Sequence, residues 1–211
     1  MYKRQPYDIY ATEKYVEDRA LKPFYDKITQ ISESVSEHLS DTQTPQGIFA
    51  VMPRRAEQLP EPLSGQFLLL DAIQDPGNVG TLVRTADAAG IQTVVFGNGT
   101  ADAFGPKVLR AMQGSQFHVR IVSAKLMPII KALHRGGIPV YGSELNEKAK
   151  SYHSIQPSER FALIVGNEGN GMDPVLLQNT DTNLYIPIRG KAESLNVAVA
   201  AAVMMFHLVG D

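Results

Sequence analysis

The sequence predicts an α/β fold in which a mostly parallel sheet carries helices on both faces. Short runs of apolar residues alternate with stretches that have a helical pattern. Two of these helical stretches are 78–90, which ends in a glycine, and 124–137. Parallel sheets covered on both faces are built from such continuous apolar strands. Six runs rich in β-branched or aromatic residues predict the strands, at 67–73, 93–97, 117–122, 138–142, 161–166 and 183–188.

The first part of the chain has a different pattern and predicts a separate small unit. Residues 1–52 combine short apolar runs with one amphipathic stretch, and they are too few to bury much core alone. Residues 53–65 are rich in proline and mixed charge, which is typical of a linker. The main domain is therefore expected to span 66–211.

Composition excludes several classes of site. The chain of 211 residues has no cysteine, which rules out disulfides, thiolate metal sites and thiol nucleophiles. Its formal net charge is −2, so contact with nucleic acid would need a local basic patch. Neither a signal peptide nor a membrane-spanning run is visible, and the five scattered histidines suggest no metal site. We expect a cytoplasmic protein without a metal or a membrane partner.

The stretch LIVGNEGNGM at 163–172 predicts a binding loop at the end of a buried strand. Its glycines, Gly166, Gly169 and Gly171, follow a G-x-x-G-x-G order that differs from the dinucleotide fingerprint and lacks the Walker ending. The carboxylate of Glu168 would also repel a phosphate. In parallel sheets ligands bind beyond the carboxyl ends of strands, so this loop is expected to hold a ligand other than a phosphate.

A second polar stretch follows the strand predicted at 67–73. Pro76 and Gly77 predict a turn, and Asn78 is a good candidate to cap the helix that carries Arg84. Taken alone, this pattern is equally well explained by a capped helix whose arginine reaches solvent.

The third polar stretch, at 186–209, ends in a helix of about four turns that is apolar on nearly every side. Ser194 or Asn196 could simply cap that helix. Because one face of this helix packs on the sheet, a second apolar surface must pack against the opposite apolar face. Met205 is expected to contact that second surface.

Three motifs in these stretches resemble those of a known enzyme family. N-x-G-x-x-x-R-T-A at 78–86, IVGNEGNGM at 164–172 and IPIRGKAESLNVAVAAAV at 186–203 resemble the motifs of the SpoU (TrmH-type) RNA ribose 2′-O-methyltransferases. The resemblance covers 66–211. It implies a C-terminal deep trefoil knot, S-adenosylmethionine as the cofactor, a homodimer, and a ribose 2′-hydroxyl of structured RNA as the substrate, with ribosomal RNA ahead of transfer RNA.

The same resemblance implies the residues that hold the cofactor. Backbone groups at Gly166, Ile186 and Leu195 would contact its adenosine, and Ser143 is a further candidate. Small residues let the backbone approach a neutral adenosine closely. A branched side chain at Gly166 is therefore expected to fill the cofactor's space while the fold survives.

The catalytic residues implied are Arg84, Asn78, Glu168, Ser194 and Asn196. Arg84 would either take the proton of the 2′-hydroxyl or contact the adjacent phosphate; an arginine base is chemically awkward because its pKa lies far above neutrality. Asn78 and Glu168 would fix Arg84 by hydrogen bonds. Ser194 and Asn196 would order the cofactor loop and the ribose.

The N-terminal unit also carries a resemblance. Residues 39–55 are similar to the end of a small ribosomal-protein-like RNA-binding domain, of which about half would be present here. A shortened RNA-binding domain leaves an alternative function open. The protein could be a non-catalytic RNA-binding protein that retained the methyltransferase fold.

Overall fold

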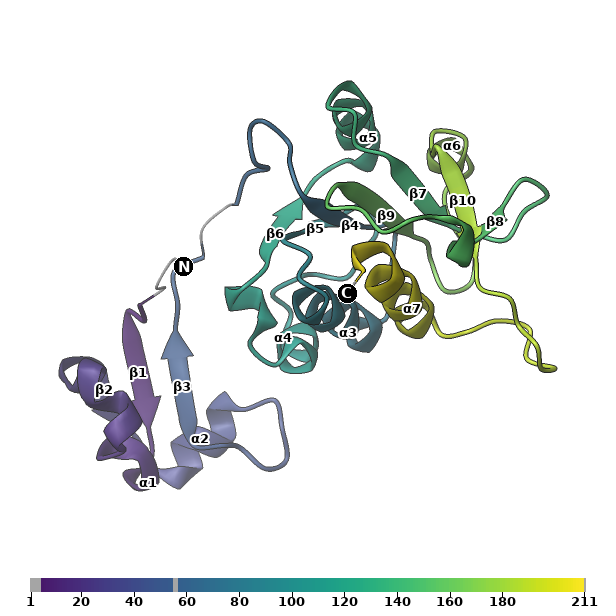
Figure 1. Cartoon of the computed structure of the whole chain (residues 1–211). Helices are drawn as coiled ribbons and strands as arrows, with labels where there is room; N and C mark the ends of the chain where they lie inside the picture. The colour runs from purple at the N-terminus through teal and green to yellow at the C-terminus, as the bar shows by residue number, and fades with distance from the viewer. Residues whose placement is uncertain (1–4, 55–56, 211) are drawn as a thin grey trace. The chain divides into compact units, whose positions relative to one another are not determined.

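The computed structural model describes residues 5–54 and 57–210 (Figure 1). The chain forms two compact units, residues 1–56 and 57–211, and the division falls inside the predicted linker. Each unit has its own sheet. None of the described helices is long and apolar enough to cross a membrane.

The first unit is a three-stranded sheet with short helices. β1 lies in the centre, parallel to β2 and antiparallel to β3, and Ile9 and Ala11 of β1 are buried. In chain order its elements are β1 (Asp8–Ala11), α1 (Glu13–Val16), the 3₁₀ helix η1 (Arg19–Lys27), β2 (Ile28–Gln30), α2 (Glu33–Leu39) and β3 (Ile48–Val51).

The second unit contains a parallel sheet of seven strands in the order β6-β5-β4-β9-β7-β10-β8. The predicted α/β class is therefore confirmed. Its elements are β4 (Gln66–Leu70), α3 (Pro76–Ala88), β5 (Thr93–Phe96), α4 (Pro106–Met112), η2 (Ser115–Phe117), β6 (Arg120–Ser123), α5 (Leu126–Arg135), β7 (Val140–Ser143), β8 (Lys150–Ser151), η3 (Tyr152–Ser154), β9 (Phe161–Val165), α6 (Pro174–Leu177), β10 (Thr182–Tyr185) and α7 (Val197–Val209).

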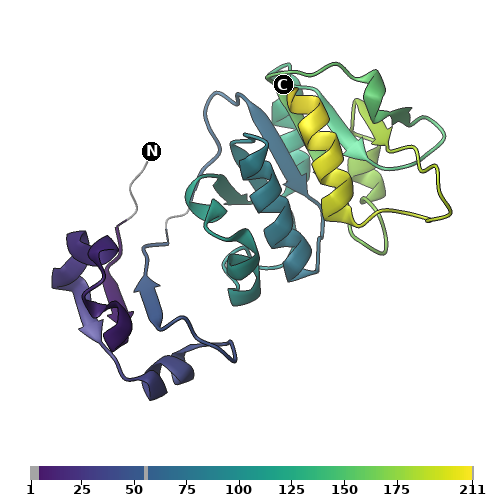
Figure 2. The ribbon, with the colours of Figure 1, turned by 60° about the horizontal axis from the view of Figure 1, so that its bottom comes forward.

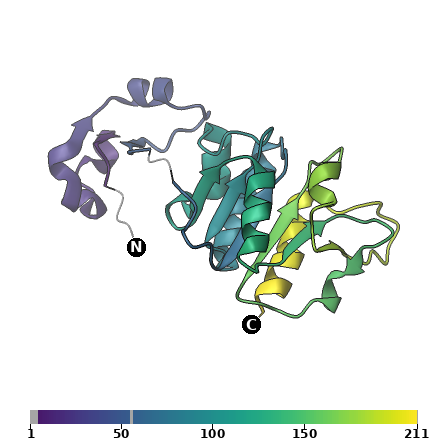
Figure 3. The ribbon, with the colours of Figure 1, turned by 90° about the horizontal axis from the view of Figure 1, so that it is seen from above.

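Helices cover both faces of this sheet. Every residue of the central strands β4 and β9 is buried, as expected for strands packed on both sides. α3, α4 and α7 form one core with the first face, and α5 and α6 form another with the opposite face. Figure 2 shows α3 and α7 next to each other across the first face, and in the view from above in Figure 3 α5 lies in front of the sheet.

The strand order places late segments in the middle of the sheet. β9 lies between β4 and β7, and β10 lies beyond β7. As a result the loops after β4, β7, β9 and β10 all leave from the same carboxyl edge. The passage of the C-terminal segment through a loop, which the family resemblance implies, stays a prediction.

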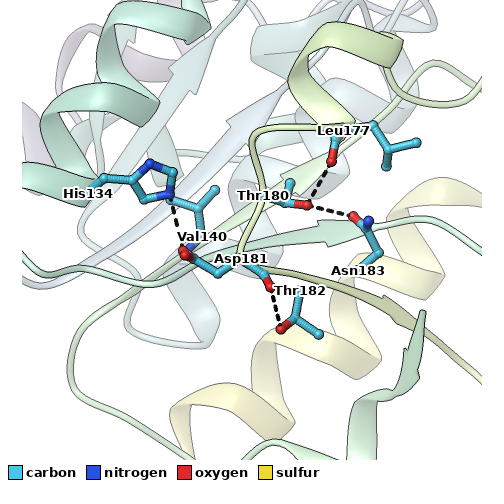
Figure 4. Close-up of polar contacts among 7 residues, drawn as sticks. All are labelled: His134, Val140, Leu177, Thr180, Asp181, Thr182 and Asn183. Atoms are coloured by element: carbon cyan, nitrogen blue, oxygen red, sulfur yellow. Dashed lines mark hydrogen bonds and ion pairs between the residues drawn. The ribbon is translucent and has the colours of Figure 1, made fainter. Parts of the chain in front are cut away.

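At the opposite, amino edge, side chains tie the start of β10 to its neighbours (Figure 4). The carboxylate of Asp181 accepts the backbone N–H of Val140 at 2.7 Å, and one of its oxygens lies 3.2 Å from Nε2 of His134. The Thr180 hydroxyl lies 2.9 Å from Oδ1 of Asn183. These contacts fix the register of β10 beside β7.

Two local expectations were wrong. Pro76 and Gly77 are the first residues of α3 instead of a turn, and the helix is capped by Asp75, whose carboxylate accepts the N–H of Asn78 at 2.7 Å. Proline suits this first position because its φ is already helical and it has no N–H to satisfy. Residue 117 belongs to η2, and the strand predicted from there begins at Arg120.

The expectation for Met205 was also wrong. Its side chain is fully buried in the core beneath α7, whereas Phe206 is 53% exposed and Val199 is 51% exposed. Because α7 is apolar on nearly every side, the sequence pattern alone does not show which side faces the sheet. The exposed apolar side of α7 passes through Val199 and Phe206, seven residues apart.

Candidate active site

A cavity of about 660 Å³ lies where the loops after β4, β7 and β9 meet the segment before α7. This size is typical of sites for small molecules. We refer to it as the cofactor cavity, after the ligand that the family resemblance implies for these residues. It is lined by Gln74, Asp75, Asn78, Ser143, Gly166, Asn167, Glu168, Gly171, Ser194, Leu195, Asn196, Val197 and Ala200.

Three of the predicted residues form a hydrogen-bonded chain along one side of this cavity. The side-chain amide of Asn78 donates to Oε1 of Glu168 at 3.0 Å. The carbonyl oxygen of the same amide accepts from Nδ2 of Asn196 at 2.9 Å. Asn78 therefore connects the three motif segments, which are far apart in sequence.

Glu168 also holds the turn that leads into α3. Its carboxylate accepts the backbone N–H groups of Gln74 at 3.3 Å and Asp75 at 3.4 Å. Partial burial raises the pKa of Glu168, but hydrogen bonds from Asn78 and from backbone N–H groups lower it more, so the net pKa lies below its usual value. The carboxylate is therefore ionised at neutral pH.

The predicted hydrogen bonds from Asn78 and Glu168 to Arg84 are not found. Arg84 lies on the exposed side of α3, outside the cofactor cavity, and its side chain makes no hydrogen bond or ion pair with the described residues. The two groups expected to hold it are instead occupied by each other and by neighbouring loops. Arg84 is thus free to meet a ligand that approaches from solvent.

Asn196 has a second contact that fixes its position. Its Oδ1 accepts the N–H groups of Ala198 at 2.9 Å and Val199 at 3.3 Å and so caps α7. One amide therefore caps the helix with its oxygen and binds Asn78 with its nitrogen. The side chain of Asn196 therefore caps the helix, as the simpler interpretation predicts, and also takes part in the site.

Asn167 organises the loop and was missed in the sequence. Its backbone pairs with Gly171 in both directions, its Oδ1 accepts from the N–H groups of Gly169 and Asn170, and its Nδ2 donates to the carbonyl of Ala72 at 2.8 Å. Asparagine that bonds to the backbone two residues later is a common turn former, and this preference was the available signal.

Gly166 is needed for a different reason from the one expected. A Cβ atom there would lie 2.4 Å from the backbone nitrogen of Met172 and 2.5 Å from the carbonyl carbon of Gly171. A larger side chain would therefore push against the loop's own backbone before it reached the cofactor. Gly166→Val is therefore expected to displace this loop as well as to fill the cofactor's space, and the survival of the overall fold stays a prediction.

The remaining predicted residues divide between the cavity and its surroundings. Ser143, Ser194 and Leu195 line the cavity together with Gly166. Ile186 does not; it is partly buried and packs against the core under α3 and α7.

The charge of the cavity limits the ligands that it fits. Its lining contains two carboxylates, of Asp75 and Glu168, and no lysine, arginine or histidine. Such a lining opposes a phosphate and suits a ligand that carries positive charge, such as a sulfonium with an amino group. Small residues and backbone groups supply the rest of the wall, which fits a nucleoside. Among the described residues, no group of three or more His, Cys, Asp or Glu is placed to hold a metal ion.

Comparison with known proteins identifies the family. The model of the SpoU rRNA Methylase family matches residues 65–206. The chain belongs to this family. The 23S rRNA (guanosine(2553)-2′-O)-methyltransferase RlmP of Bacillus subtilis is 52% identical over 180 residues, which cover 85% of this chain and 71% of that protein.

Solved structures of the family have the same fold. An RNA methyltransferase of the TrmH family from Porphyromonas gingivalis has a TM-score of 0.86 at 34% identity, with 98% of this chain and 83% of that chain covered. An AdoMet-bound rRNA methyltransferase from Sinorhizobium meliloti has a TM-score of 0.86 at 28% identity, with 98% of this chain and 80% of that one covered. The predicted membership of the SpoU family is confirmed.

Proposed function

We propose that this protein transfers a methyl group from S-adenosylmethionine to a ribose 2′-hydroxyl of ribosomal RNA. The observation that carries the proposal is the cofactor cavity: it joins the three family motifs and has two carboxylates but no cationic side chain. Two family members support the cofactor and the substrate class, namely the rRNA 2′-O-methyltransferase of Bacillus subtilis and the AdoMet-bound rRNA methyltransferase of Sinorhizobium meliloti.

The cavity residues would hold the cofactor and the loops around it. Backbone groups near Gly166 and Leu195, with Ser143, would bind the adenosine. The carboxylate of Glu168 would attract the positive charge of the cofactor and keep the turn before α3 in place. When bound, S-adenosylmethionine would supply an electrophilic methyl group to the 2′-oxygen, with S-adenosylhomocysteine as the leaving group and solvent water as the acceptor of the hydroxyl proton.

The 2′-hydroxyl would be positioned by the chain of Asn78, Glu168 and Asn196. Holding a nucleophile and its target in line removes much of the entropic cost of the reaction. Arg84 extends from α3 outside the cavity, and its guanidinium suits a bidentate contact with a phosphate of the RNA. Contact with the adjacent phosphate therefore agrees better with its exposed, unpaired position than the role of a base, for which a pKa far above neutrality is unsuitable.

The exposed apolar side of α7 supports a homodimer. Val199 and Phe206 are more than half exposed and lie on the same side of the helix, close in sequence to the cavity residues that precede α7. A two-fold contact through this side would bury both residues twice. We further propose a cytoplasmic location and the trefoil passage of the C-terminal segment, in line with the family resemblance.

The deciding experiment is methyl transfer. The purified protein is incubated with labelled S-adenosylmethionine and either ribosomal or transfer RNA that lacks the modification, and the labelled nucleotide is mapped. The nucleotide to examine first is the one named for the Bacillus subtilis relative, guanosine 2553 of 23S rRNA. Binding of RNA without any transfer would favour the alternative of a non-catalytic RNA-binding protein.

A further inference from the structure

A second cavity of about 530 Å³ adjoins the cofactor cavity on the other side of the glycine loop. The two cavities share three lining residues, Gln74, Asn167 and Gly171. The loop is held between them by the bond from Asn167 to the carbonyl of Ala72. Ala72 has a φ of +53°, which residues other than glycine adopt only where the surroundings enforce it.

The lining of the second cavity combines an apolar wall with separate polar groups. Met127, Val175 and Leu176 contribute to the apolar part. Its charged groups are the carboxylates of Asp71 and Asp173 and the ammonium group of Lys125. A flat heterocycle is bound by such a combination, since its faces need apolar contacts and its edge needs hydrogen bonds.

Asp71 is the buried acceptor in this cavity. It directly follows β4, its residue is 9% exposed, and its Oδ2 accepts the N–H of Asp173 at 2.7 Å. Its Oδ1 accepts no hydrogen bond from the residues that the structure describes. An ionised carboxylate offers about four acceptor positions, so most of its capacity is open. Burial raises the pKa of Asp71, and two donors from a ligand would favour its charged form.

The carboxylate of Asp173, in contrast, is already used. Its Oδ1 accepts the N–H groups of Val175 and Leu176 at the start of α6. Lys125 is the N-cap residue of α5 and lies at the border with a third cavity of about 420 Å³, which continues along the same sheet edge. The ammonium group of Lys125 is exposed there and is suited to contact with an RNA phosphate.

We propose that the second cavity receives the base of the target nucleotide and that Asp71 selects guanine. This inference rests on the proposed function. A base joined to a ribose at the cofactor cavity has to lie beside that cavity, and the second cavity borders it. Guanine presents two adjacent donors, N1–H and the N2 amino group, to one carboxylate. Cytosine and uracil present no such pair, and adenine has an acceptor at N1 and a C–H at C2, so it can form neither bond.

The test compares bases and variants in the same assay. The RNA is a synthetic 23S rRNA fragment centred on guanosine 2553, together with copies that carry inosine or adenosine at that position. Inosine lacks only the N2 amino group. With the wild-type protein and S-adenosylmethionine, kcat/KM should fall about 10-fold with inosine and about 100-fold with adenosine, as expected for the loss of one or both hydrogen bonds in a base contact.

Asp71→Asn should lower kcat/KM for the guanosine fragment and bring the guanosine-to-inosine ratio close to one. The amide oxygen can still accept the N–H of Asp173, so the loop and the affinity for S-adenosylmethionine, measured by calorimetry, should be kept. The matched control is Asp181→Asn, which also neutralises a carboxylate that accepts a backbone N–H, but at the amino edge of the sheet (Figure 4). It should leave the ratio unchanged.

The inference is overturned if the wild-type protein methylates the guanosine and inosine fragments equally, or if Asp71→Asn keeps the wild-type ratio. The first comparison needs no variant and holds even if Asp71→Asn does not fold. If no fragment is methylated, fluorescence anisotropy of the labelled fragments makes the same comparison through binding. Failure of the proposed function would differ, because the wild-type protein would then transfer no methyl group to any RNA, complete ribosomal RNA included.

Discussion

Removing the carboxylate of Glu168 should affect catalysis far more than folding. In Glu168→Ala, Asn78 loses its acceptor at 3.0 Å, and the N–H groups of Gln74 and Asp75 lose theirs at 3.3 and 3.4 Å. All these groups are near solvent, and water can replace the lost bonds, so the free energy of unfolding should fall by only about 1 kcal/mol. In a chain of this length that corresponds to about 2–4 °C in Tm.

The turn before α3, by contrast, loses its link to the glycine loop. A displacement of reacting groups by about 1 Å can cost about 100-fold in rate, and kcat for methyl transfer should fall by this order. The assay is single-turnover transfer of labelled methyl to RNA, with thermal unfolding followed in parallel. Glu159→Ala, an exposed carboxylate before β9 at the amino edge, is the control and should match the wild type.

The pH dependence of stability gives a further check on the same residue. The folded-state pKa of Glu168 lies below its ordinary value of 4.5, so its contribution is present above that value and is lost as the pH falls through the lower folded-state pKa. The difference in Tm between the wild type and Glu168→Gln should therefore shrink on acidification below about pH 4.5. Full transfer activity in Glu168→Ala, or a Tm difference that grows in acid, would refute the reasoning.

Four other substitutions test three separate parts of the molecule. Arg84→Ala should reduce methyl transfer at least about 100-fold while calorimetry shows unchanged S-adenosylmethionine affinity, because Arg84 lies outside the cavity; a lost affinity would contradict this placement. Gly166→Ala should lower the free energy of unfolding by about 1–3 kcal/mol and should also lower cofactor affinity, because the new Cβ meets the backbone of Met172. An unchanged Tm would contradict this and show that the loop backbone can shift without cost. Phe206→Asp should leave the fold intact and give a monomer in light scattering, whereas Met205→Asp should unfold the protein by burying a charge; a Phe206→Asp dimer would exclude this side of α7 as the interface.

Local sequence patterns were sufficient to locate the elements in which every residue has the same environment. β4 and β9 are apolar throughout because both faces of each strand are covered, and this gave their positions to within a few residues. β8 has only two residues, which is too short for any periodicity, and it was not predicted. The cap of α3 was misplaced by three residues because Asp75 and Asn78 are both good capping residues, and only the geometry of Pro76 decides between them.

The residue types at the site were also visible in the sequence, through the three motifs, but their contacts were not. The sequence suggested that Asn78 and Glu168 would hold Arg84, a neighbour on the same helix or across one loop. The structure instead joins Asn78 to Glu168, 90 residues away, and to Asn196, 118 residues away. Pairings over such separations depend on the order of the strands, and no local pattern encodes that order.

The sequence by itself therefore determined the fold class, the edge of the sheet where the ligand loops gather, and the family, because each depends on the spacing of residues along the chain. Only the tertiary structure decided which side of α7 is buried, what Glu168 holds, and that a second cavity with Asp71 lies behind the glycine loop. A helix that is apolar all round has no preferred side until the sheet is present. Hydrogen-bond partners and cavities likewise arise only when β9 is placed between β4 and β7.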